Sequence, residues 1–204
     1  MTKKEIRFIE TIPNETITLA PKSDLVLVGL ITQGWEGTRE FKIDASGEGS
    51  SFRGIFFVLG EKKDSFLVNI TSIHNANDTL IHTRVRAALM DSAVCNISGV
   101  AKVQEKIIGA DSYFSHHTLL LSENSSAKAA PNLEIKSDSV KAGHAASVGK
   151  VDEEALFYLL SRGISQKDAK ALLVQGFFET EMSGIEDEHI KSVIREALTK
   201  FLFK

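Results

Sequence analysis

The sequence contains a single cysteine, and this scarcity limits the chemistry available to the chain. Cys95 has no second cysteine in the chain to pair with, so neither an internal disulfide framework nor an intrachain two-thiolate zinc site can form. A reducing compartment is the natural expectation, and we predict a cytoplasmic protein. Cys95 itself lies between apolar neighbours, where a free thiol usually packs as a small buried hydrophobe.

Long apolar runs and an excess of basic residues are also missing. The longest apolar runs, 25–31 and 55–59, are far shorter than the roughly 20 residues that cross a bilayer. The opening residues 1–6 include basic side chains but no apolar region follows them, so no secretory leader is predicted. Lys and Arg number 24 against 27 Asp and Glu. This balance argues against nucleic-acid binding, and no membrane segment is predicted.

Common catalytic motifs are absent from the sequence. It contains no G-x-x-x-x-G-K-[ST] phosphate loop, no H-E-x-x-H zinc helix and no G-x-S-x-G nucleophile elbow. We therefore predict that the chain is not an enzyme of these types and that any nucleotide hydrolysis belongs to a partner. One enzymatic alternative stays open, because β-helices often host enzymes that act on polysaccharides.

Short β-rich runs dominate residues 17–148, each bounded by Gly, Asn, Asp, Ser or charged residues. Their spacing of 12 to 15 residues suggests stacked rungs, but an antiparallel sandwich or barrel would show the same spacing. The small residues of 122–131 resemble a tight turn region of a solenoid. The predicted strand centres are Val28, Lys42, Phe56, Val68, Thr83 and Cys95.

Helical periodicity replaces the strand pattern after Lys150, so we divide the chain into a β-rich part (1–150) and a helical C-terminal domain (151–204). Asp152 and Ser165 are the predicted caps of the first two helices. Two apolar stripes are predicted: the second helix has Ala169, Leu172, Leu173 and Phe177, and the third has Ile190, Val193, Ile194, Ala197, Leu198, Phe201 and Leu202. These stripes must pack against something, either the end of the β region or a partner.

The stretch 84–182 resembles the core of the SufB/SufD family, which takes part in iron-sulfur cluster assembly. The resemblance rests on Leu156-Phe157-Tyr158-Leu159, Ser161-Arg162-Gly163-Ile164, Leu172-Leu173 and Gly176-Phe177, together with residues of 119–152 such as Pro131, Asp138 and His144. It implies a mainly β fold, a right-handed parallel β-helix core with a C-terminal α-helical domain. It also implies a scaffold that is not an enzyme, docked on an ABC-type ATPase, SufC.

The resemblance also points to site residues. The SufB branch has a Cys just before the Leu-Leu segment and a Glu after the histidine; this chain has His116 or His117 and Ala145 there. The SufD branch has C-x-H-G-A-T-V-G, and this chain keeps His144 but has Ala142 in place of the Cys. His144 is therefore the candidate metal ligand, while a histidine hydrogen-bonded within the structure is the alternative. His116 and His117 are weaker candidates because adjacent strand residues point to opposite faces.

Partner and cofactor predictions follow from the same resemblance. We expect a homodimer or a heterodimer with a SufB/SufD paralogue, and ATPase contacts through Leu172, Leu173, Phe177 and Phe178. Phe177 and Phe178 differ by about 100° around a helix, so only one of them can point into the core. The isolated chain is expected to bind no cofactor stably, although a transient iron-sulfur cluster is possible. A family member that binds the ATPase but has lost cluster chemistry is a further alternative.

Overall fold

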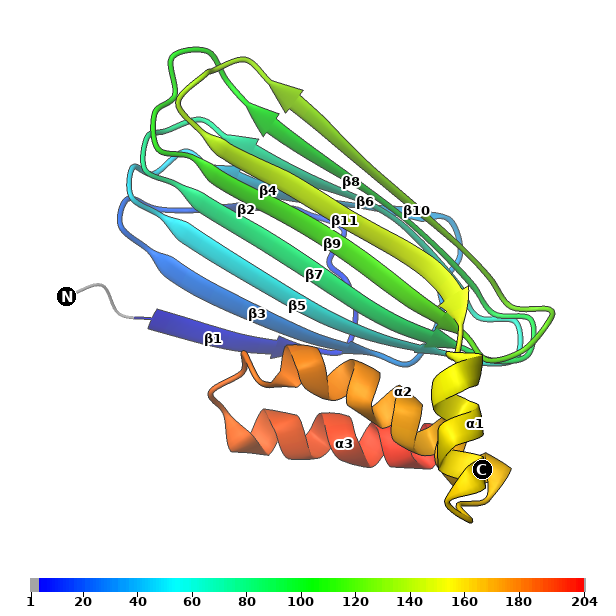
Figure 1. The fold of residues 1–204 in the computed structure, drawn as a ribbon. Coiled ribbons are helices and arrows are strands. Elements are labelled where there is room, and N and C mark those ends of the chain that lie inside the picture. The colour runs from blue at the N-terminus through cyan, green and yellow to red at the C-terminus, as the bar shows by residue number, and fades with distance from the viewer. Residues whose placement is uncertain (1–3, 204) are drawn as a thin grey trace.

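The computed structural model describes residues 4–203; the first three residues, on which the leader prediction partly rests, and Lys204 lie outside this description. Within it, strands alternate between two parallel sheets (Figure 1). Sheet A contains β1 (Lys4–Ile9), β3 (Asp24–Ile31), β5 (Ser51–Gly60), β7 (Leu80–Leu89), β9 (Asp111–Leu120) and β11 (Lys141–Lys150). Sheet B contains β2 (Thr16–Thr18), β4 (Thr38–Ala45), β6 (Ser65–His74), β8 (Val94–Val103) and β10 (Ser126–Ile135).

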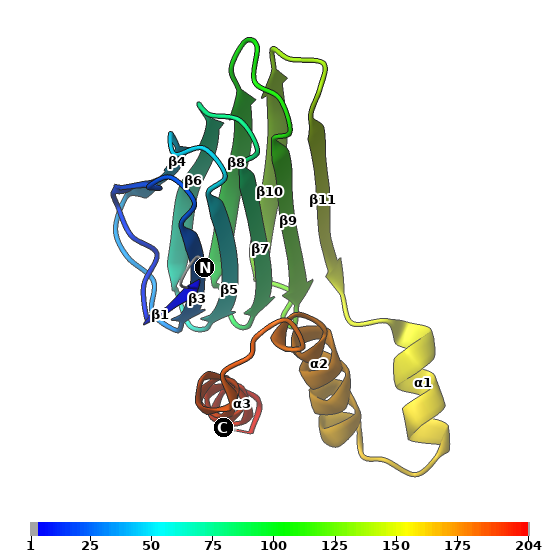
Figure 2. The same ribbon diagram turned by 90° about the vertical axis from the view of Figure 1, so that its left-hand side faces the viewer.

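The strands stack as rungs of a flattened solenoid (Figure 2). In sheet A, Asp24 pairs with Ser51 and Ser51 pairs with Leu80, all in parallel register. This parallel pairing confirms the β-helix prediction and excludes the antiparallel sandwich. All six predicted strand centres lie within strands. The turn prediction for 122–131 is wrong from Ser126 onward, because that segment is β10 and pairs with β8 along its whole length.

The interior between the sheets is filled by inward-facing side chains of alternate strand positions. Phe41 contacts two aromatic neighbours, with ring centroids 6.3 Å from Phe52 and 6.1 Å from Phe56. All three are fully buried. Farther along the solenoid the interior is narrower, since a side chain at Gly99 would place a Cβ 2.6 Å from the Phe114 ring. Close packing of this kind fixes the register of the two sheets.

Three helices follow the last strand: α1 (Glu153–Ser161), α2 (Gln166–Met182) and α3 (Glu188–Leu202). Both predicted caps are confirmed, because the Asp152 side chain accepts from two backbone N–H groups and the Ser165 side chain accepts from the Asp168 N–H. Gly163 follows α1 with a φ of +83°, which suits a residue without a side chain. Among residues 4–203, none of the helices is both long and apolar enough to cross a membrane.

Helices α2 and α3 pack on the outer face of sheet A rather than across the end of the solenoid (Figures 1 and 2). That face is apolar on β3 and β5, where Val28 and Phe57 are fully buried beneath the helices. The idea that the helices cap the terminal rung is therefore wrong. The apolar surface that they cover lies on the outer face of the sheet.

The apolar stripe predicted for α3 is confirmed, but the one predicted for α2 is mostly wrong. Ile190, Ile194, Leu198 and Phe201 of α3 are buried. In α2 the buried residues are Ala169, Ala171, Val174, Phe178 and Met182. The helix has apolar residues on more than one side, so the surface of sheet A, rather than the helix sequence, selects the buried side.

Candidate functional site

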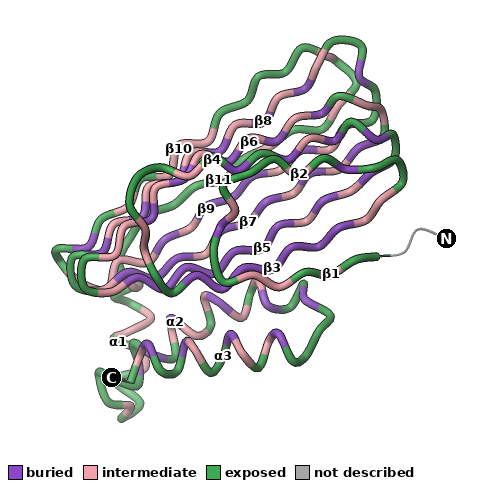
Figure 3. Tube along the Cα trace, turned by 180° about the vertical axis from the view of Figure 1, so that it is seen from behind, coloured by how far each residue is buried: buried purple, intermediate pink, exposed green. Residues whose placement is uncertain are grey.

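The candidate site lies at the last rung, formed by β10 and β11. On β11, His144 pairs in register with Phe114 of β9, whose side chain points into the solenoid. Neighbouring residues in a parallel ladder point to the same face, so His144 also faces inward. It is nevertheless exposed, because in residues 4–203 no further rung follows β11 (Figure 3).

The interior of this last rung is open and partly apolar. Leu133 of β10 is 38% exposed and Val148 of β11 is 39% exposed. One rung earlier, the residue that pairs with Leu133 is Ala101, which is 3% exposed. We define the open rung as seven of the inward-facing residues of β10 and β11: Ala129, Pro131, Leu133, Ile135, His144, Ala146 and Val148. It combines apolar side chains, one imidazole and two unpaired strand edges.

His116 lies one rung deeper, in the interior. It is fully buried on β9, beside Ala146 in the register of β11. Its Nε2 is 2.9 Å from the Thr118 hydroxyl, with which it shares a hydrogen bond, and 3.9 Å from the Cys95 sulfur. Its Nδ1 has no hydrogen-bond partner. Burial, with a smaller effect from His117, lowers the pKa of His116 to about 4, so the ring is neutral at pH 7.

Cys95 meets His116 across the interior, from β8 on the opposite sheet. The thiol is fully buried, as predicted from its apolar neighbours. Burial raises its pKa to about 12, so it remains protonated, and a protonated thiol is a poor metal ligand. The sequence did not predict that these residues meet, because their contact depends on how the two sheets are aligned.

His117 points to the outer face of sheet A, as expected for the neighbour of an inward-facing residue. Its Nδ1 is 2.7 Å from the Ser147 hydroxyl of β11. It therefore does not share a site with His116 or His144. Within residues 4–203 there is no group of three or more His, Cys, Asp or Glu side chains able to hold a metal ion. The described residues of one chain do not complete a metal site at the open rung, because a stable one needs about four ligands.

The four residues predicted to contact a partner differ in accessibility. Leu172 is 48% exposed, whereas Leu173 and Phe177 are half-buried. Phe178 is fully buried and its ring stacks on Phe57 at 5.8 Å, so the prediction that it contacts a partner is corrected. Phe177 is the outer of the two, and the Arg86 guanidinium lies 4.6 Å from its ring centre.

Sequence reasoning missed a set of exposed apolar residues on α1, a helix with no buried residue. Phe157 is 72% exposed, Tyr158 57% and Leu160 38%. We name these three residues together with Leu172 the helical apolar surface. The apolar run 155–160 could have predicted this exposed surface, but it was taken only as evidence of family resemblance.

These features define a class of protein: a two-sheet parallel β-solenoid with an open terminal rung and a helical extension that leaves apolar side chains exposed. The surface has an edge suited to pairing and a helix pair suited to docking, both typical of an assembly subunit.

Comparisons with known proteins agree with this class. The family model for the SufBD core domain of the SUF system of FeS cluster assembly matches residues 9–177. SufD of Bacillus subtilis (strain 168) is 34% identical over 132 residues, which cover 65% of this chain and 30% of that protein. SufD of Escherichia coli (strain K12) is 28% identical over 152 residues, which cover 73% of this chain and 35% of that protein. The chain therefore belongs to the SufB/SufD family, and it spans about a third of the length of these relatives.

Proposed function

We propose that this chain is a SufD-like subunit of a Suf-type iron-sulfur cluster assembly complex in the cytoplasm. In this role it acts as a scaffold, binds a SufC-like ABC ATPase through α1 and α2, and pairs through its open rung with itself or a SufB/SufD paralogue. The observation that carries the proposal is the helical apolar surface, because such exposure on a helix pair is costly unless a partner covers it. Membership of the SufB/SufD family supports the choice of Suf-type partners.

Substitutions in the helical apolar surface should weaken ATPase binding without unfolding the chain. Phe157→Ala and Leu172→Ala are each expected to cost about 2 kcal/mol or more of binding free energy, as central interface residues do. Their melting temperatures should stay close to that of the wild type, because both side chains are exposed. Calorimetric titration with the SufC-type ATPase of the same complex, alongside melting curves, measures both quantities.

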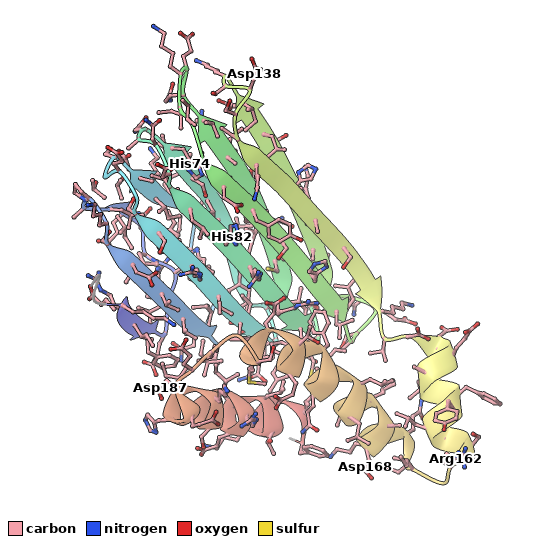
Figure 4. The ribbon with its side chains drawn as sticks, turned by 60° about the vertical axis from the view of Figure 1, so that its left-hand side comes forward. His74, His82, Asp138, Arg162, Asp168 and Asp187 are labelled. Atoms are coloured by element: carbon pink, nitrogen blue, oxygen red, sulfur yellow. The ribbon has the colours of Figure 1, made fainter. Side chains whose placement is uncertain are left out.

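Ile108→Ala is the matched control. Ile108 is an apolar residue with 59% exposure, in the turn before β9. Its backbone pairs with Asp78, and the adjacent Gly109 pairs with Ser139, so it lies beside the turn marked by Asp138 at the far end of the strands (Figure 4). We expect the Ile108→Ala variant to bind the ATPase like the wild type. Equal binding by all three variants would contradict docking on α1 and α2.

The second expected result concerns the cofactor: the purified chain alone should hold little or no iron and sulfide. The only thiol is protonated and buried, and Ala142 and Ala145 stand where the resemblance to the two branches implies a Cys and a Glu. Cys95→Ser should therefore match the wild type in cluster delivery within the complex. Iron and sulfide analysis, with visible absorption spectra, tests the first statement.

A Cys95→Ala variant serves as the control for this test. Ala removes the thiol without placing a hydroxyl in the apolar interior, so it separates loss of a ligand from a packing effect. A stoichiometric cluster on the isolated chain that both Cys95 variants lose would contradict the cofactor proposal. If the ATPase binds normally but the complex delivers no cluster, this chain would be a family member that keeps only the docking role.

A further inference from the structure

The outer face of sheet A has a polar half that the helices leave uncovered. Beyond the apolar strands β3 and β5, the outward-facing polar residues of β7 are His82, Arg84 and Arg86. A groove of about 530 Å³ lies over β7, β9 and β11, with Glu181 of α2 among its lining residues. His82, labelled in Figure 4, lies on β7 within this polar half. We name this feature the outer groove.

The register of the strands explains why this surface is hollow. Arg84 pairs with Ser115 of β9, which pairs with Ala145 of β11. In the row before it, Tyr113 pairs with Gly143, which has no side chain. The long side chain of Arg84 therefore stands beside the short side chains of Ser115 and Ala145, and the Gly143 position of β11 is empty beside Tyr113. The result is a depression with cationic side chains along one side and the Tyr113 ring near one end.

The positive charges of the outer groove are only partly neutralised. Glu181 bonds Arg86 at 3.0 Å, but its other oxygen is 3.8 Å from Arg84, beyond hydrogen-bond distance. Asp111, the other lining carboxylate, is hydrogen-bonded to His82 Nε2 at 2.8 Å. Within residues 4–203, Lys141 has no ion-pair partner. The two carboxylates are thus set against three permanently cationic side chains and two histidines.

We propose that the outer groove binds a small molecule that carries phosphate groups. The planar guanidinium of Arg84 can donate two parallel hydrogen bonds to a phosphate, and Lys141 adds a point charge from the opposite strand. The volume lies within the range of sites for small ligands and leaves room for more than one phosphate. The Tyr113 ring offers a surface on which a flat ring attached to the phosphates could stack. This site goes beyond the proposed scaffold role, because its residues lie outside both the open rung and the helical apolar surface.

Calorimetric titration of the full chain at low salt tests the proposal with inorganic pyrophosphate, ADP and, as a singly charged control, acetate. Pyrophosphate should bind, acetate should not, and Arg84→Gln should weaken pyrophosphate binding about tenfold or more. Arg84 is chosen because the distance between its guanidinium and Glu181 is long, at 3.8 Å. Replacing Arg84 should therefore leave the melting temperature nearly unchanged. ADP that binds more tightly than pyrophosphate, with the difference lost in Tyr113→Leu, would identify a nucleotide as the ligand; equal affinity would identify the phosphates alone.

Arg53→Gln is the matched control variant. Arg53 faces outward on β5 of the same sheet, pairs with Asp24 at 2.8 Å and is not among the groove residues. It should bind pyrophosphate like the wild type. The proposal is overturned if the wild-type chain binds neither pyrophosphate nor ADP, if acetate binds equally well, or if Arg84→Gln and Arg53→Gln bind alike.

Discussion

Phe178→Ala is expected to lower the free energy of unfolding by about 3–5 kcal/mol, the usual range for a buried phenylalanine. Phe178 is fully buried between α2 and sheet A, and its ring stacks on Phe57 with an interplanar angle of 28°. Removing it leaves a cavity where the helices join the solenoid. Urea unfolding, followed by circular dichroism, measures the change, and the midpoint should fall while the native β signal is kept.

Leu172→Ala is the matched control on the same helix. Leu172 is 48% exposed, so its loss should change the free energy of unfolding by no more than about 0.5 kcal/mol. The pair of variants thus separates the side of α2 that holds the fold from the side proposed to contact the ATPase. Equal destabilisation by both would mean that α2 packs differently in solution.

Leu133→Asp is expected to disrupt the proposed dimer, raising its dissociation constant at least about a hundredfold. Leu133 faces the open rung and would be covered when two copies, or this chain and a SufB/SufD paralogue, join their strand edges. A carboxylate there would be buried without a partner charge. Sedimentation velocity over a range of concentrations, with and without the paralogue, measures the effect.

Asn132→Asp provides the control for the dimer experiment. Asn132 is the neighbour of Leu133 on β10 and points to the outside of the solenoid, so it adds the same charge outside the open rung. It should associate like the wild type. A wild-type chain that stays monomeric alone and with the paralogue, or a dimer that tolerates Leu133→Asp, would contradict pairing through this rung.

Local signals predicted most of the secondary structure. The caps at Asp152 and Ser165 were predictable because they depend on residues within one helical turn. The stripe of α3 was predictable because its apolar residues form one face. The parallel arrangement of the strands was not predictable from spacing, since both a solenoid and a sandwich space strands this way. The family resemblance supplied it.

The misassignments share a cause: each depended on a surface far away in the sequence. Ala171 and Val174 of α2 are smaller than Leu172 and Leu173, yet they are the buried ones, and Val174 belongs to the core cluster shared with sheet A. The small residues of 126–131 resembled a turn, but small side chains suit the interior of the last rungs. Only part of the candidate site was predicted from the sequence. His144 was identified as a candidate ligand, but its position in an open rung was not, because that position depends on the strand register.

The interior of the early rungs is aromatic, with Phe41, Phe52 and Phe56 on β4 and β5, whereas the inward positions of β10 and β11 include several alanines. In a stacked array each rung is stabilised mainly by its neighbours, so folding starts where a rung is strongest and spreads outward. We therefore expect the aromatic rungs to form first and β10 and β11 to form last, on a template that already exists. We expect them also to open first in the native state, which would let the last rung adjust its strand edges to the proposed partner chain without loosening the rungs that hold the fold.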